Sequence, residues 1–144
     1  MKKYRFGLGS VLRVRRAEED MARARMAVTQ SEVDRATAEL DQRLAAIGAA
    51  RPDPRRSLGT AFAAEREQLR RHAVAVTAAR SAEANALTEL RVAREEWEAA
   101  ARRVRALERM DERHRAAWHL EATRAAQAAT DEIAMTHANR ELGR

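Results

Sequence analysis

Histidines and neighbouring acids are the side chains of this sequence whose types could do chemistry. His114 and His119 are five residues apart, a rotation of about 500° on a helix, so they do not share the face that an i, i+4 pair of metal ligands needs. Glu95 and Glu96 are adjacent and point to different sides of a helix, so they do not form an acid–base pair. We expect these histidines and acids to be solvent-exposed or to lie at the edge of a helix interface.

The sequence offers no other catalytic arrangement. It contains no cysteine, which excludes disulfides and cysteine-based zinc sites. None of its five glycines belongs to a phosphate-binding loop, so the chain should not hydrolyse nucleotide. We therefore predict a protein that is not an enzyme, with no catalytic residue, no metal site and no cofactor.

The composition favours long helices over a compact globule. Of 144 residues, 3% are aromatic and 35% are charged, and Ala, Arg, Glu and Leu dominate, as is typical of coiled coils. We predict a single coiled-coil domain over residues 1–144. No apolar run approaches the length of a membrane span, and Arg13 interrupts the short apolar stretch after the basic start. We expect neither a signal peptide nor direct membrane insertion.

All of the net charge of +6 lies in residues 1–16. Residues 17–144 carry 22 Arg and 22 acids, which cancel and are interleaved as on a solvated helix face. The basic segment carries no acid and contains Lys2, Lys3, Arg5, Arg13, Arg15 and Arg16. With Tyr4 and Phe6 it could bind nucleic acid weakly and in a salt-sensitive way, but the neutral remainder argues against a specific nucleic-acid partner.

Proline and glycine divide the chain into two helices. Both prolines lie in residues 48–59, which we predict to be the inter-helix turn. The helices are expected at about 10–47, with Ser10 as the N-cap, and about 60–141, stopped by Gly143. The predicted fold is all-α, an antiparallel two-helix coiled-coil hairpin with unequal helix lengths.

Apolar residues spaced alternately three and four apart predict the buried row, or seam, of each helix. In the first helix the seam is expected to change phase between Val28 and Val33. The first phase contains Val14, Ala17, Met21, Ala24 and Val28, and the second contains Val33, Thr37, Leu40, Leu44 and Ile47. The seam predicted for the second helix contains Leu69, Ala73, Val76, Arg80, Glu83, Leu87, Leu90, Arg94, Trp97, Ala101 and Val104.

The unequal lengths predict an overhang. At a rise of 1.5 Å per residue the helices span roughly 57 and 120 Å, so the first should cover the second only to about residue 97. Residues 100–144 would then be a C-terminal helical overhang, which needs a partner because an isolated helix is marginal in water. Trp118 is equally consistent with an adjusted seam and with a partner contact.

Two short stretches resemble the flagellar FliJ family, the stalk proteins of the flagellar type III export apparatus. Residues 4–15, Tyr-Arg-Phe-Gly-Leu-Gly-Ser-Val-Leu-Arg-Val-Arg, are similar to the family's opening Phe-x-Leu-x-x-Val-Leu-x-x-Arg, and the acids Glu18, Glu19 and Asp20 follow. The second stretch is residues 131–134, Asp-Glu-Ile-Ala. The related stalk proteins of virulence-type secretion systems have the same architecture, and a structural coiled-coil scaffold is a further alternative.

The resemblance implies a non-enzymatic stalk similar to the gamma subunit of the rotary F-type ATPase. It implies binding to and activation of the hexameric flagellar export ATPase, contact with the cytoplasmic domain of the export gate and transient binding of export chaperones. It places the protein in the cytoplasm, peripherally at the inner membrane. The ATPase contacts expected from it are Phe6, Leu8, Leu12, Arg13, Arg16, Asp131, Glu132 and Ile133. The expected gate contacts are Leu40, Leu44, Ile47 and Phe62.

Overall fold

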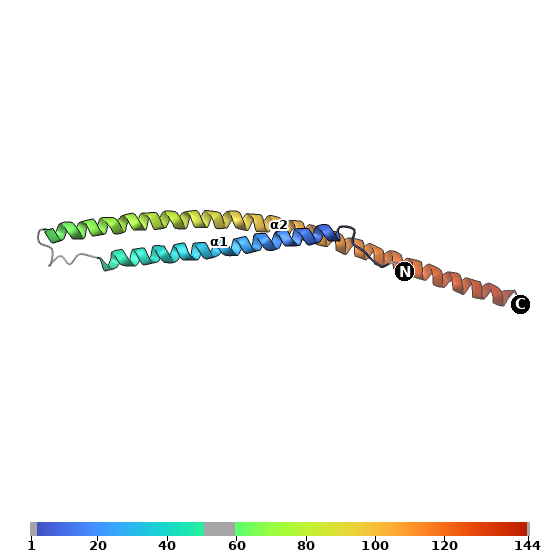
Figure 1. Ribbon diagram of the computed structural model, residues 1–144. Coiled ribbons are helices and arrows are strands. Elements are labelled where there is room, and N and C mark those ends of the chain that lie inside the picture. The colour runs from blue at the N-terminus through green and yellow to red at the C-terminus, as the bar shows by residue number, and fades with distance from the viewer. Residues whose placement is uncertain (1–2, 51–59, 144) are drawn as a thin grey trace. The chain divides into compact units, whose positions relative to one another are not determined.

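Two α-helices and no strand make up the part of the chain that the computed structural model describes, residues 3–50 and 60–143. Helix α1 is Gly9–Ala49, with 41 residues, and helix α2 is Thr60–Leu142, with 83 residues (Figure 1). The predicted all-α hairpin with unequal helices is confirmed, and the predicted bounds are within two residues of the observed ones. Of the predicted turn at 48–59, residues 48 and 49 are helical and residues 51–59 lie outside the described residues.

The start of α1 differs from the prediction. The first bond of the α-helical type runs from the N–H of Leu12 to the carbonyl of Leu8 (2.9 Å), and the N–H of Gly9 donates to the carbonyl of Phe6 (3.2 Å). Ser10 is therefore already inside the first turn, and its predicted role as the N-cap is wrong. The turn at Phe6–Gly9 starts the helix earlier than a side-chain cap at Ser10 would. Gly143 does follow the end of α2, as predicted.

By its contacts the chain forms two compact units. The terminal unit contains Met1–Glu18 and Ala100–Arg144, and the middle unit contains Glu19–Ala99. Each unit takes one stretch from each helix.

In the middle unit, the seam of α2 contains a column of alanines. Ala79 and Ala93 are buried, with Ala93 only 2% exposed, and Ala86 between them is half-buried. The large residues of this seam were predicted at the right heptad positions, since Val76 and Leu90 are buried and Leu69 and Trp97 are half-buried. Of the residues predicted between them, Glu83 is half-buried, whereas the following four are exposed and their predicted place in the seam was wrong: Ala73, Arg80, Leu87 and Arg94.

The observed seam of α1 also lies on a different face of the helix from the residues of the first predicted phase. Val14, Met21 and Val28 are 58%, 66% and 57% exposed, and Ala17 and Ala24 are exposed as well. Nine of the buried and half-buried positions form one continuous row with no change of phase: Leu12, Arg15, Glu19, Ala22, Met26, Thr29, Val33, Ala36 and Leu40. The predicted phase break between Val28 and Val33 is therefore wrong.

Small residues explain why the observed seam was missed. Ala22, Ala36 and Thr29 alternate with larger side chains, and a reading that ranks residues by hydrophobicity prefers the nearby Val and Met. Thr29 can be buried because its hydroxyl donates to the carbonyls of Met26 (3.0 Å) or Arg25 (3.3 Å), which satisfies its polar group. Alanine loses no rotamer freedom on burial and lets the helix axes approach each other.

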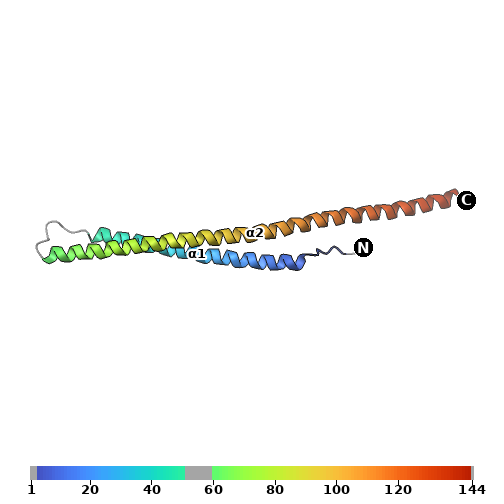
Figure 2. The ribbon, with the colours of Figure 1, turned by 90° about the horizontal axis from the view of Figure 1, so that it is seen from above.

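The register of the middle unit leaves the first turns of α2 beyond the end of α1. The Thr37 hydroxyl donates to Glu83 (2.9 Å), and Arg25 pairs with Glu96 (3.0 Å), as expected for antiparallel neighbours. Continued to the end of α1, this register brings Ala50 beside residue 70 of α2. Both Figure 1 and Figure 2 show α2 beginning beyond the end of α1.

We predict that the alanine column tolerates no larger side chain. Ala93→Leu should lower the free energy of unfolding by about 1–3 kcal/mol, because the added atoms must separate the helices. Leu87→Ala, at the exposed neighbouring face of the same helix, should cost less than Ala93→Leu. Thermal unfolding followed by circular dichroism measures both variants. A larger loss for Leu87→Ala would contradict this assignment of the seam.

Candidate partner-binding site at the chain termini

In the terminal unit, the segment before α1 is fastened to α2 by Tyr4. Its hydroxyl donates to the Asp111 carboxylate (2.6 Å) and lies 3.2 Å from the Asp111 carbonyl oxygen. Asp111 also pairs with Arg115 (2.9 Å), and the guanidinium carbon of Arg115 lies 5.6 Å from the centre of the Tyr4 ring. We call Tyr4, Asp111 and Arg115 the latch. Its three side chains satisfy one another through a hydrogen bond, an ion pair and a cation–π contact.

Aromatic contacts extend the latch along α2. The rings of Tyr4 and Trp118 are 6.0 Å apart at 56°, and those of Phe6 and His114 are 6.0 Å apart in an edge-on arrangement at 78°. Trp118 is half-buried. Of the two roles considered for Trp118, the structure shows a contact within the chain.

The latch raises the pKa of Tyr4 above its ordinary value of 10.0. Burial against α2 is the main cause, and the hydrogen bond to Asp111 and the charge of that carboxylate act in the same direction, while Arg115 lowers the pKa. The phenol therefore keeps its proton near neutral pH and donates a hydrogen bond to the Asp111 carboxylate.

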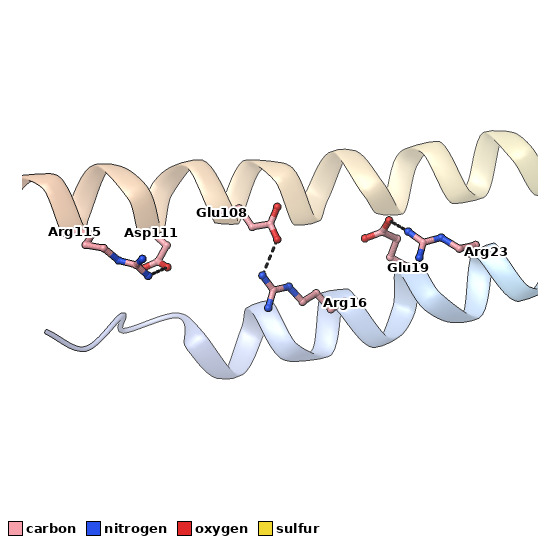
Figure 3. A network of polar contacts seen from close by, with 6 residues as sticks. All are labelled: Arg16, Glu19, Arg23, Glu108, Asp111 and Arg115. Carbon is pink, nitrogen blue, oxygen red and sulfur yellow. Dashed lines mark hydrogen bonds and ion pairs between the residues drawn. The ribbon is translucent and has the colours of Figure 1, made fainter.

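The first turns of α1 continue the packing on α2. Arg16 pairs with Glu108 (2.7 Å), as Figure 3 shows together with the Asp111–Arg115 pair. Leu12 of α1, like Ala101 and Val104 of α2, is buried. Because the Arg16–Glu108 pair is exposed to solvent, it contributes at most about 1 kcal/mol, and the apolar residues hold the packing.

The chain N-terminal to and within α1 therefore covers α2 further toward its C-terminus than the sequence predicted. The length estimate ended it near residue 97, whereas Tyr4 contacts Trp118. The estimate placed the end of α1 beside the start of α2, and the observed register displaces α1 toward the C-terminus of α2. The uncovered part of α2 begins after about Ala122, which is half-buried.

A groove with excess positive charge lies between the N-terminal segment and α2. Among the residues that line it, Arg5, Arg13 and Arg115 face a single acid, Asp111. Both Tyr4 and Arg115 already engage that acid. The groove is thus suited to a partner that brings carboxylates.

The structure brings most of the expected N-terminal ATPase contacts together here. Phe6 is half-buried, Leu8 and Arg13 are exposed, and Arg16 is exposed while paired with Glu108. Leu12 is different, because it is 8% exposed and belongs to the seam. A partner could touch Leu12 only by opening the helix pair.

The other expected ATPase contacts lie on the uncovered turns of α2. Asp131, Glu132 and Ile133 are exposed, and the side chain of Ile133 shows 60% of its area to solvent. Residues 123–140 are exposed without exception. They form a helix with no neighbour in the part of the chain that the structure describes, as both ribbon views show (Figures 1 and 2).

The expected gate contacts belong to the middle unit and form two groups. Leu40 and Ile47 are half-buried on α1, and Leu44 beside them is exposed. Phe62 is exposed on α2, in a groove that is lined by residues of α2 alone. By the register, Ile47 lies beside residue 73, so Phe62 is about three helical turns further along.

The sequence reading missed the latch. In the sequence Tyr4 stands out only as an aromatic residue in a basic segment, and the Asp111 carboxylate that accepts its hydrogen bond lies 107 positions away. The available signal was weak: Tyr4 is the only tyrosine, and Asp111, Arg115 and Trp118 follow one another at helical spacing.

Among the described residues, no group of three or more His, Cys, Asp or Glu could hold a metal ion. No helix in this part of the chain is long and apolar enough to cross a membrane.

The fold defines the structural class of this protein, an antiparallel two-helix coiled coil whose longer helix carries uncovered turns. Comparison with known protein families agrees with this class and identifies the family within it. The family model described as flagellar FliJ protein matches residues 4–143. The chain therefore belongs to the flagellar FliJ family, whose members are stalk-like export components rather than enzymes. No curated protein and no solved structure matches the chain.

We predict that the latch opens when Tyr4 ionises. Because the folded state raises the pKa of Tyr4, the stability that the latch adds is complete below the ordinary pKa of 10.0 and is lost as the pH rises through the raised value. Tyr4 is the only tyrosine, so tyrosinate absorbance reports its titration directly. Asp111→Asn should lower this pKa, and Glu112→Gln, which removes the neighbouring carboxylate, should not. Equal pKa values in the two variants would contradict the latch.

Proposed function

We propose that this protein is a non-enzymatic stalk of flagellar type III export that binds and activates the hexameric export ATPase through its terminal unit. The observation that carries the proposal is the run of exposed turns of α2, residues 123–140, beyond the segment fastened by Tyr4. A helix of this length without packing is marginal in water, so a partner that surrounds it supplies the missing stabilisation.

The ATPase surface would combine two sets of side chains. One is the basic N-terminal set of Phe6, Leu8, Arg13 and Arg16, which provides charge for encounter and apolar area for contact. The other is Asp131, Glu132 and Ile133 on the uncovered turns. A single stalk within a ring touches chemically equivalent subunits differently, and this asymmetry would bias their assembly and nucleotide state.

The middle unit would contact the export gate. Leu44 and Phe62 expose apolar area, and Leu40 and Ile47 are half-buried beside Leu44. The cytoplasmic domain of the gate is the proposed partner here, and export chaperones would bind transiently. The protein would then lie in the cytoplasm at the inner membrane, held there through its partners.

We predict that removing residues 123–144 abolishes stimulation of the export ATPase and lowers its hexamer fraction. The deletion starts after the half-buried Ala122, and residues 123–140 are all exposed, so the coiled coil should keep its helical signal per residue and its unfolding temperature. The measurement is the ATPase rate with and without the protein. Full stimulation by a truncated chain would leave a structural coiled-coil scaffold as the better account.

A charge swap distinguishes two roles of Arg16, contact with the ATPase and stabilisation of the helix pair. Arg16→Glu places two acids together at Glu108, whereas Arg16→Glu with Glu108→Arg restores the pair in reverse. If Arg16 contacts the ATPase, both variants should lose stimulation, by about tenfold in half-saturating concentration for a contact of about 1.4 kcal/mol. Recovery in the double variant would show that Arg16 only holds the two helices together. Arg80→Glu, exposed in the middle unit, is the control for added acid.

A further inference from the structure

Helix α1 has an apolar row that no part of the described chain covers. Met21, Ala24 and Val28 are exposed, and the same alternation of three and four continues along the helix to Ala17 and Val14. This is the first phase of the predicted seam, a coiled-coil pattern that is present in the sequence and unused in the structure. We call these five residues the outer stripe.

The outer stripe and the seam lie on nearly opposite sides of α1. At 100° per residue, the mean directions of the two rows differ by about 150°. Two apolar faces on one helix are typical of a helix that packs between two others. Single exposed apolar residues need no explanation, but five at heptad spacing form a continuous surface suited to a second helix.

We propose that the outer stripe pairs with the outer stripe of a second copy of this chain, antiparallel about Met21. The order of residue types supports this occupant, because Val, Ala, Met, Ala and Val read the same in both directions. A two-fold axis at Met21 brings Val14 beside Val28 of the second copy and Met21 beside its own equivalent. Such a pairing is isologous and closes at two chains.

Charge is also complementary in this arrangement. Glu18, which pairs with Arg15 (2.7 Å), and Arg25, which pairs with Glu96 (3.0 Å), flank the stripe on one side. The two-fold axis places Glu18 of one copy beside Arg25 of the other, twice, so each can add a partner across the interface. Asp20 lies near its own equivalent, where Arg23, already 3.6 Å from it, reduces the repulsion. The flanking charges therefore favour the antiparallel pairing.

A groove beside Val28 gives the second copy's Val14 a place to pack. Val28 and Val92 provide its apolar area, and Arg25, Glu32 and Glu89 provide its polar rim. Val92 is 40% exposed, so it has area left to bury. With about two heptads on each chain the interface is small, and the dimer should be weak and reversible.

Single introduced cysteines test the pairing, because the natural chain has none. Met21→Cys should give covalent dimers on mild oxidation, since the two positions meet at the axis. Val74→Cys, equally exposed on α2 but off the stripe, should cross-link far less. Equal yields for the two variants would overturn the proposal.

Orientation is tested with Val14→Cys and Val28→Cys. In the antiparallel dimer each lies roughly 21 Å from its own equivalent, too far for a disulfide, so neither should cross-link alone and a mixture should. Cross-linking of Val14→Cys to itself would overturn the antiparallel arrangement.

Sedimentation velocity over a range of concentrations tests the dimer without a cross-link. The natural chain should shift from monomer toward dimer as its concentration rises. Met21→Glu should move this transition to at least tenfold higher concentration, and Val74→Glu should leave it unchanged. Circular dichroism checks that both variants remain helical. A chain that stays monomeric at every concentration would overturn the proposal and assign the stripe to a different protein. Val14 and Ala17 of the stripe belong to the terminal unit, and Met21, Ala24 and Val28 belong to the middle unit. None of these five residues is among the proposed ATPase contacts, so failure of ATPase stimulation would leave the dimer proposal standing.

Discussion

The alternation of large and small side chains along the two buried seams is the constraint on which this structure depends. Alanines at successive heptad positions of α2, from Ala79 to Ala100, allow close approach to α1, and larger residues fill the space between them. Since a one-residue change of frame would bring Arg80 and Arg94 into the interface, this packing also fixes which face of α2 is buried. The seam sets the register, and the register sets which turns of α2 are left for partners.

Helix bounds and fold class could be predicted because they follow from strong local signals. Both prolines lie in one segment, and no proline interrupts either helix. The seam was harder to predict because two frames compete. Leu87 is more hydrophobic than Ala86, and Val28 more than Thr29, yet the smaller residue of each pair is the more buried. Close packing and a satisfied hydroxyl outweigh the greater transfer free energy of the larger side chain, and a single sequence shows neither.

The candidate site could be predicted in outline from the charge distribution and the helix lengths. The acid-free start of the chain pointed to the N-terminal segment, and the unequal helices pointed to uncovered turns of α2. The latch could not be predicted, because Tyr4 and Asp111 meet only when the register is known, and the assumed register placed the two helix ends side by side. Leu12 shows the same limit: the family pattern includes it, and packing rather than partner contact explains its burial.

The ion pairs of this chain leave its surface available for association. Most are exposed pairs three or four residues apart on one helix, such as Arg43–Glu39 and Arg91–Glu95, and each contributes a few tenths of a kcal/mol. Pairs of this strength neither choose the register nor resist exchange with a partner's charges. The fold therefore rests on a thin apolar seam while the charged faces remain solvated. In a coiled coil of this kind, specific recognition falls to the features that break the neutral pattern: the basic segment, the uncovered turns of α2 and the apolar outer stripe of α1.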